Sequence, residues 1–232
     1  MSSSIASNVQ KIRETIQRAA QQSGRDPASV CLVAATKTVS CDQLEEAYAA
    51  QIRHFGENRL QEAQGKMKEF GPREGLSWHF IGRMQRRKLK ALVGQFCLLH
   101  SVESLEQARE LDSLAERSQV RQDALLQVNI GGEQSKGGFS VESVKQAVED
   151  LDQLAHLHIR GLMTLPPWTE DPEASRPYFA GLRQVRDELA QRPLRRMHLQ
   201  DLSMGMSHDY HIAIQEGATF VRIGTAIFGE RA

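Results

Sequence analysis

Short apolar runs alternate with amphipathic stretches along this chain, and that alternation constrains the fold more than any other feature. There are eight such runs, and several are apolar nearly throughout. This is typical of strands in a parallel sheet that is covered on both faces. The runs are 30–36, 52–56, 78–82, 96–102, 124–130, 159–164, 197–202 and 219–224.

The stretches between the runs carry apolar residues at helical spacing, and residues 4–22 form a further amphipathic stretch before the first run. Ser40 with Gln43, and Ser104 with Gln107, have the spacing of a capping box just ahead of two of these predicted helices. Eight strands that alternate with helices leave two architectures, a closed barrel and an open doubly wound sheet.

The first strand decides between these two architectures. The sequence ATKTVS (35–40) stands at the end of this strand and just after it. The Gly-rich fingerprint of the open dinucleotide-binding sheet is missing there. The length of 232 residues is also close to the ~250 typical of a barrel. We therefore predict an α/β fold, a single (β/α)8 barrel of the TIM type over residues 1–232, with an extra N-terminal helix.

Composition excludes several classes of partner. Basic and acidic residues balance at 29 each, so the net charge gives no reason to expect nucleic acid or an anionic membrane surface as a partner. The three cysteines form no CxxC pair, which favours a reducing compartment over a disulfide framework. The N-terminus lacks a secretory signal, and no apolar run is long enough to span a bilayer. We expect a cytoplasmic monomer.

Two polar clusters could form other kinds of site. A basic segment could bind nucleic acid or form a solvated helix face, and the absence of interleaved aromatic residues favours the latter. A histidine-rich turn could hold a metal, but a helix N-terminus disfavours a cation and no further ligand is evident, so no metal is expected. The first cluster is Arg83, Arg86, Arg87, Lys88 and Lys90, and the second is His208, Asp209 and His211.

Lys37 directly follows the first strand. In a barrel, functional residues gather at the C-terminal ends of the strands, so Lys37 should lie at the mouth. A lysine partly removed from water has a lowered pKa and can form an imine with an aldehyde. Taken alone, a lysine in this position is more often a strand-end residue that extends to solvent.

Two loops near the C-terminus favour the first alternative. Segment 202–207 follows the seventh strand and segment 221–226 closes the eighth. Both contain small residues, which leave backbone N–H groups free to bind phosphate. Gly205 and Gly224 could each serve only as a turn residue. Both loops together, opposite Lys37, point to a phosphate-bearing aldehyde as the ligand.

Four more residues at strand ends are candidates for ligand contact. Arg222 could donate to a ring nitrogen or a phosphate, or form an ion pair in the barrel wall. Asn58 and His79 could hold a hydroxyl group, although such groups more often have structural roles. Met163 is more often a core residue than a ligand contact.

The motifs along the chain resemble those of the pyridoxal phosphate homeostasis protein family, which is related to the barrel domain of bacterial alanine racemase. The resemblance covers almost the whole chain. The motifs appear in order as AATKTVS (34–40), HFGENRLQEA (54–63), WHFIGRMQ (78–85), LHSVES (99–104), QVNIGGEQSKGGF (127–139), RGLMTLPP (160–167), LSMGMSHDY (202–210) and VRIGTAIFGER (221–231).

The resemblance implies a fold-type III barrel that binds pyridoxal 5'-phosphate (PLP) and takes part in PLP homeostasis. It implies that Lys37 forms the PLP imine and that Arg222 faces the pyridine nitrogen. It assigns the phosphate to Ser207, Gly224 and Thr225, and places Asn58, His79, Met163 and Ser203 near the cofactor. The chain differs from the family pattern at Arg87, where Asn is frequent, and at His208, where an acidic residue is frequent.

The same resemblance leaves a PLP-dependent racemase as the alternative function. Racemase relatives use a second base, a tyrosine supplied by a separate C-terminal domain of the partner subunit. This chain ends soon after the eighth strand, and its tyrosines, Tyr48, Tyr178 and Tyr210, fall in predicted helices. We therefore expect a PLP carrier without robust turnover, with no catalytic residue assigned, that could supply PLP-dependent apoenzymes.

Overall fold

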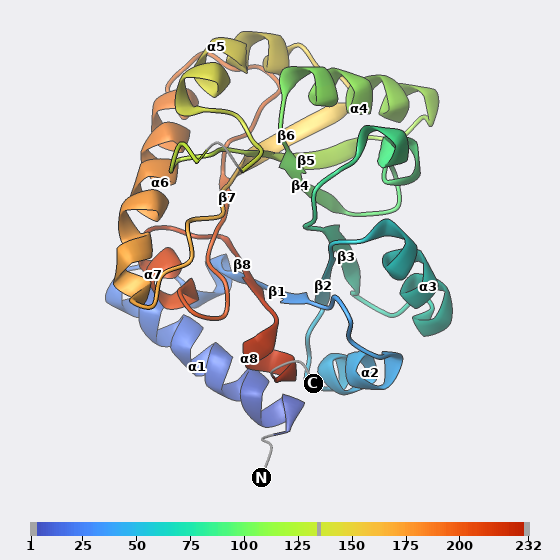
Figure 1. The fold of residues 1–232 in the computed structure, drawn as a ribbon, viewed down its shortest axis with the longest axis vertical. Coiled ribbons are helices and arrows are strands. Elements are labelled where there is room, and N and C mark those ends of the chain that lie inside the picture. Colours follow the sequence, from blue (N-terminus) through green and yellow to red (C-terminus); the bar gives the residue numbers. More distant parts are fainter. Residues whose placement is uncertain (1–3, 134–135, 230–232) are drawn as a thin grey trace.

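Eight parallel strands close into a barrel, and helices surround it (Figure 1). The computed structural model describes residues 4–133 and 136–229. Strand β1 pairs with both β2 and β8, so the sheet closes, as predicted, and the open-sheet alternative is excluded. The strands are β1 (Cys31–Ala35), β2 (His54–Glu57), β3 (Ser77–Phe80), β4 (Leu98–Val102), β5 (Gln122–Gln127), β6 (Leu157–Met163), β7 (Asp201–Ser203) and β8 (Phe220–Ile223).

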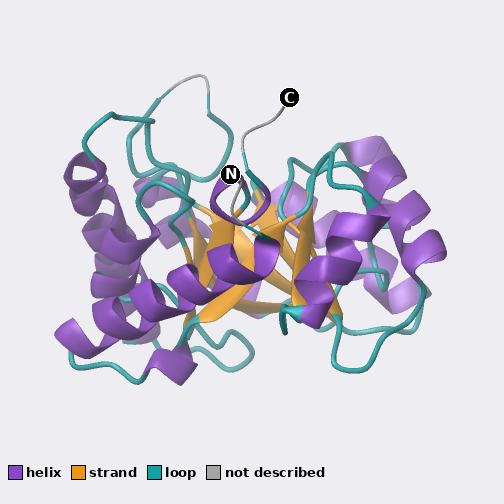
Figure 2. Ribbon diagram, turned by 90° about the horizontal axis from the view of Figure 1, so that it is seen from below, coloured by secondary structure: helices purple, strands orange, loops and turns teal. Residues whose placement is uncertain are grey.

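The helices form an outer layer, and a view at right angles shows them on both sides of the strands (Figure 2). The predicted N-terminal helix is α1, which packs against α7 and α8. The helices are α1 (Ile5–Gln22), α2 (Cys41–Ala49), α3 (Leu60–Phe70), α4 (Leu105–Arg117), α5 (Val141–Asp152), α6 (Arg176–Ala190), α7 (Tyr210–Gln215) and α8 (Thr225–Phe228), with short 3-10 helices η1 (Pro27–Ser29), η2 (Arg86–Ala91) and η3 (Pro172–Ser175). In the described part of the chain, no helix is both long and apolar enough to cross a membrane.

One predicted capping box forms completely and the other in part. The Ser40 hydroxyl accepts from the Gln43 backbone N–H, and the Gln43 side chain accepts from the Ser40 N–H in return. Ser104 also accepts from the Gln107 N–H, but the Gln107 side chain accepts from the N–H of Glu103, one residue earlier. Both helices therefore begin where the sequence predicted.

The basic segment differs from the expected helix face. Only Arg86–Ala91 is helical, as the 3-10 helix η2. An α-helix there would place Arg86 and Lys90 at the repulsive i,i+4 spacing. Arg83 and Arg86 instead form exposed ion pairs with Glu103 and Glu110.

Strand β7 is also shorter and later than the predicted run 197–202. The carboxylate of Asp152 accepts from the backbone N–H groups of Arg195, Arg196 and Met197. These contacts hold the start of the predicted run in a turn, so the strand begins only at Asp201.

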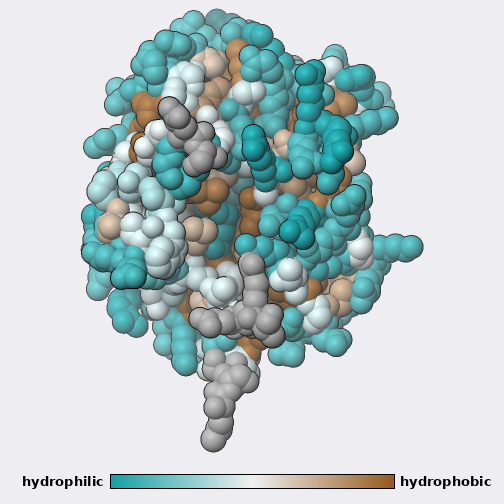
Figure 3. Space-filling model, viewed as in Figure 1, coloured by the Kyte–Doolittle hydropathy of each residue, from teal (hydrophilic) through white to brown (hydrophobic). Residues whose placement is uncertain are grey.

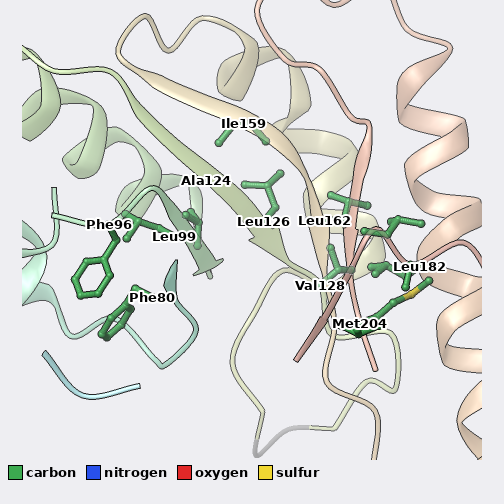
Figure 4. Close-up of a cluster of buried hydrophobic side chains, with 14 of the residues drawn as sticks. Phe80, Phe96, Leu99, Ala124, Leu126, Val128, Ile159, Leu162, Leu182 and Met204 are labelled. Atoms are coloured by element: carbon green, nitrogen blue, oxygen red, sulfur yellow. The ribbon is translucent and has the colours of Figure 1, made fainter. Parts of the chain in front are cut away.

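Side chains alternate between two separate hydrophobic clusters along the strands. The outer cluster lies between the strands and the helices, where Phe80, Leu99, Leu126 and Leu162 are among its members (Figure 4). The inner cluster fills part of the barrel interior and consists of Val33, Leu98, Leu125, Met163 and Phe220. Buried polar residues, among them His100, Ser203 and Arg222, also lie inside the barrel, and Arg222 borders the cavity described next.

Candidate functional site

A cavity of about 720 Å³ lies where β1, β7 and β8 end. In the space-filling view along the barrel, hydrophobic residues gather near the centre of a largely hydrophilic face (Figure 3). The cavity brings together five of the predicted residues, Lys37, Ser207, Arg222, Gly224 and Thr225. Its other lining residues are Ala35, Thr38, Val39, Gln43, Trp168, Met206, His208, Phe228 and Gly229.

Lys37 is exposed in the cavity, and the backbone on both sides of it is anchored by a buried ion-pair network. Lys66 of α3 donates to the Thr36 carbonyl oxygen and to Glu57 at 2.8 Å. Lys66 also donates to Glu62 at 2.6 Å, and Glu62 accepts from the Thr38 N–H at 2.5 Å. The network therefore fixes the residues immediately before and after Lys37.

The two carboxylates of this network have opposite pKa shifts. Burial raises the pKa of Glu57, and the hydrogen bonds from Lys66 and Thr36 only partly offset this effect. Burial opposes ionisation of Glu62 as well, but its hydrogen bonds from Lys66 and Thr38 outweigh that effect and lower its pKa. Thr38 has a φ of 62°, in the left-handed region that non-glycine residues rarely adopt, which the Glu62 contact helps to hold.

Ser207 lies where the loops after β7 and β8 meet. Its hydroxyl oxygen accepts from the backbone N–H groups of Gly224 and Ala226, at 3.2 and 3.3 Å. These two N–H groups converge on one point at the edge of the cavity. Converging N–H groups of this kind bind anions such as phosphate.

Arg222 is buried and presents its guanidinium at the floor of the cavity. It donates to the Ser203 hydroxyl at 2.5 Å and to the Thr164 carbonyl oxygen at 3.0 Å, both of which are neutral. Burial lowers the pKa of Arg222 to about 10, so the group stays charged at neutral pH. The predicted alternative, an ion pair in the barrel wall, does not describe these contacts.

Four predicted site residues lie outside the cavity lining. His79 and Ser203 are buried beneath Arg222, and Met163 belongs to the inner hydrophobic cluster. Asn58 is half-buried at the end of β2, and its Oδ1 atom has no hydrogen-bond partner among the described residues.

Sequence reasoning missed Trp168, Gln43 and the anchoring residue Lys66. Trp168 is 74% exposed, and its ring lies 6.3 Å from that of His208 at the rim of the cavity. The i,i+4 pair of Glu62 and Lys66 was a readable signal in the sequence, whereas Trp168 lies in a Pro-rich loop whose path no periodicity predicts. Among the described residues, no group of three or more His, Cys, Asp or Glu is placed to hold a metal ion.

Three comparisons with known proteins bear on this site. The family model of the alanine racemase N-terminal domain matches residues 5–232. The chain is 44% identical to the pyridoxal phosphate homeostasis protein of Aquifex aeolicus (strain VF5) over 221 residues, covering 95% of this chain and 96% of the relative. These two matches each span nearly the whole chain.

Solved structures agree with the sequence matches. The structure of PipY from Synechococcus elongatus PCC7942, with PLP bound, superposes with a TM-score of 0.82 at 36% identity, covering 93% of this chain and 100% of PipY. Alanine racemase of Clostridium difficile 630 shares the barrel fold with a TM-score of 0.70 at 15% identity, over 97% of this chain and 57% of the racemase. The chain belongs to the pyridoxal phosphate homeostasis protein family, built on the alanine racemase N-terminal domain.

Proposed function

We propose that this protein binds PLP at the cavity around Lys37 and takes part in intracellular PLP homeostasis, without robust catalytic turnover. The observation that carries the proposal is that Lys37 and the converging N–H groups of Gly224 and Ala226 border one cavity. An amine and an anion site together match a phosphate-bearing aldehyde. The PipY relative, 36% identical, was solved with PLP bound.

The residues present fit the cofactor. Lys37 would supply the amine that links covalently to the aldehyde carbon. Ser207, Gly224 and Thr225 would hold the phosphate, and a phosphate oxygen can take the place of the Ser207 hydroxyl as acceptor. Asn58 follows β2 on this side of the barrel, and its buried Oδ1 has no hydrogen-bond partner among the described residues, so the side chain would turn towards the cavity to accept from the ring hydroxyl. When bound, PLP supplies a reactive aldehyde and, in enzymes, an electron sink.

Two features support carriage over racemization. Racemization needs a second acid–base group opposite the lysine, within reach of the substrate carbon. Tyr48, Tyr178 and Tyr210 all lie in helices outside the cavity lining. Charged Arg222 beside the ring would also disfavour protonation of the pyridine nitrogen, which weakens the electron sink.

The wider role follows from the same site. Residues 1–232 would act as one PLP-binding domain, a monomer whose partners are PLP and PLP-dependent apoenzymes that receive it. The cytoplasm fits the free thiols of Cys31, Cys41 and Cys97.

Borohydride reduction tests the attachment. Purified protein incubated with PLP and reduced should carry a pyridoxyl group on Lys37, identified by peptide mapping. Lys37→Arg should lose this label, and Lys68→Arg, on the exposed face of α3, should keep it. A label found only on another lysine would remove the central claim.

An amino-acid racemization assay tests the absence of turnover. The holo-protein incubated with L-alanine should form no D-isomer above the Lys37→Arg background, and the same preparation should reactivate a PLP-dependent apoenzyme. A racemization rate on the order of 1 per second would favour the racemase alternative.

A further inference from the structure

Three histidines inside the barrel form a continuous hydrogen-bonded chain that leads to the cavity floor. Nδ1 of His54 lies 3.0 Å from Nε2 of His79, and Nδ1 of His79 lies 3.0 Å from Nε2 of His100. Nδ1 of His100 lies 2.8 Å from the hydroxyl oxygen of Ser203, which also accepts from Arg222. The chain therefore links the start of β2 to the guanidinium at the proposed cofactor site.

The strand register explains how these rings meet. His54 pairs with Ser77, so His79, two residues further along β3, faces the same side of the sheet. His79 in turn pairs with Leu98, and His100, two residues further along β4, faces the same side of the sheet as Leu98. Neighbouring rings are 5.2 Å apart between centroids, and Phe220 packs against two of them.

All three rings are neutral at physiological pH. Burial lowers the pKa of His54, lowers that of His79 to about 3, and lowers that of His100 well below its usual value. A neutral imidazole has one N–H donor and one nitrogen acceptor. Because His79 and His100 use both nitrogens within the chain, the donor at one link determines the donor at every other link.

Ser203 decides between the two possible directions. If His100 donated to Ser203, the serine hydroxyl hydrogen would need another acceptor, and the described residues provide none for this fully buried side chain. If Ser203 donates to His100, every polar atom of the link is satisfied. The charge of Arg222 favours the same direction, since it attracts the oxygen lone pairs and repels the hydroxyl hydrogen.

We propose that His54, His79 and His100 are all Nε2–H tautomers, and that this chain holds Ser203 as an acceptor that aims the charged Arg222 at the cavity. His79 and His100 are then positioning residues for the cofactor ring, although neither lines the cavity. The inference rests on the proposed PLP function, because the pyridine nitrogen is the acceptor that Arg222 would face.

Because the three histidines are neutral, they leave the charge of Arg222 available to select the ligand. A carboxylate in the place of Ser203 would neutralise the guanidinium directly, whereas a serine backed by neutral imidazoles does not. Asp209 raises the pKa of Arg222, but its Oδ1 atom is engaged with the Met206 N–H. The guanidinium charge thus favours a ligand with an unprotonated ring nitrogen over one without a ring nitrogen.

The tautomers can be measured without any cofactor. Long-range 1H–15N correlation spectra of the 15N-labelled protein distinguish Nε2–H from Nδ1–H rings, and single histidine variants assign the signals. We expect Nε2–H for all three rings at pH 7, with and without PLP. An Nδ1–H tautomer or a charged imidazolium at His79 or His100 would overturn the proposal.

Ligand affinity tests the positioning role. His100→Leu should weaken PLP binding about tenfold or more, but leave binding of 1-deaza-PLP, which lacks the ring nitrogen, nearly unchanged. His100→Asn should restore much of the affinity, because its amide oxygen can stand near the position of Nδ1 and accept from Ser203. His198→Leu, at an exposed histidine outside the chain, is the matched control.

Ser203→Ala repeats the comparison if His100→Leu fails to fold, since it removes a single oxygen atom. Equal losses for PLP and 1-deaza-PLP would overturn the positioning role. A wild-type protein that binds neither ligand would contradict the proposed function instead. The tautomer spectra would still test the predicted Nε2–H tautomers of the three histidines.

Discussion

Lys66 lies outside the cavity, but its contacts anchor the backbone on either side of Lys37. Its ammonium group satisfies two carboxylates and the Thr36 carbonyl, and only 9% of its side chain is exposed. Such a buried network is stable only while every charge in it has a partner. The loop that presents Lys37 is therefore tied to the integrity of an ion pair beneath it.

Lys66→Met should destabilise the protein by about 3 kcal/mol, because it leaves the buried Glu57 carboxylate without its cationic partner. PLP dissociation should become faster in the same variant, since Thr36 and Thr38 lose their anchor. Urea unfolding and stopped-flow release measure the two effects. The double variant K66M/E57Q should recover much of the stability. The control Lys68→Met should change neither the stability nor the rate of PLP release. A Lys66→Met protein as stable as wild type would contradict the argument.

The loops after β7 and β8 meet at Ser207, and the proposed anion site needs both of them. Neither loop is sufficient, because Ser207 belongs to the first loop and the N–H groups of Gly224 and Ala226 belong to the second. The contact between them exists only because β7 and β8 are adjacent in the barrel. An anion bound there would contact both loops and hold them together.

Removing the phosphate from the ligand should weaken binding at least a hundredfold, because several charge-assisted hydrogen bonds of about 1.5–3 kcal/mol each are lost. Ser207→Ala should weaken PLP about tenfold and leave pyridoxal unaffected. Spectroscopic titrations with both ligands test this expectation. Ser140→Ala, which removes the N-cap of α5, should lower stability without changing either affinity. Equal affinities for PLP and pyridoxal would place the phosphate elsewhere.

The barrel as a whole keeps a row of neutral histidines away from water. The rings of His79 and His100 pack against the ring of the inner apolar residue Phe220, and both histidines are at most 2% exposed. In the unfolded chain both rings would gain a proton near pH 6.5, whereas in the folded state they resist protonation. The unfolded state therefore binds more protons in mildly acidic solution.

The free energy of unfolding should fall as the pH drops from about 6.5 towards 5. Below the pKa that a histidine has in the unfolded chain, the unfolded state gains a proton that the folded state does not bind. Each of the two rings should contribute a loss of about 1.5 kcal/mol over that interval. The raised pKa values of Glu57 and Asp201 act in the opposite direction. Urea unfolding at several pH values should give a shallower dependence for His79→Gln than for wild type. His198→Gln should keep the wild-type dependence, and an identical slope in His79→Gln would refute the account.

The order of the strands, the barrel and the lysine at the end of β1 were determined by the sequence itself. Apolar runs and helix caps are local signals, because they depend on neighbours along the chain, and even the Glu62–Lys66 pair is one helical turn long. The small residues around Ser207 and Gly224 likewise predicted an anion site from local composition. Strand limits were less accurate, as at β7, where Asp152 from a distant helix holds the preceding turn.

Only the tertiary structure decided which of the candidates share the cavity. His79 and Ser203 were predicted near the ligand, but side-chain alternation and strand stagger place them beneath Arg222, in a chain with His54 and His100. No spacing in the sequence indicates that chain, because its members are contributed by four strands whose relative register is set by barrel closure. The same closure pairs β1 with β8, the first and last strands, and so brings Lys37, which follows β1, to the same cavity as Gly224, which follows β8.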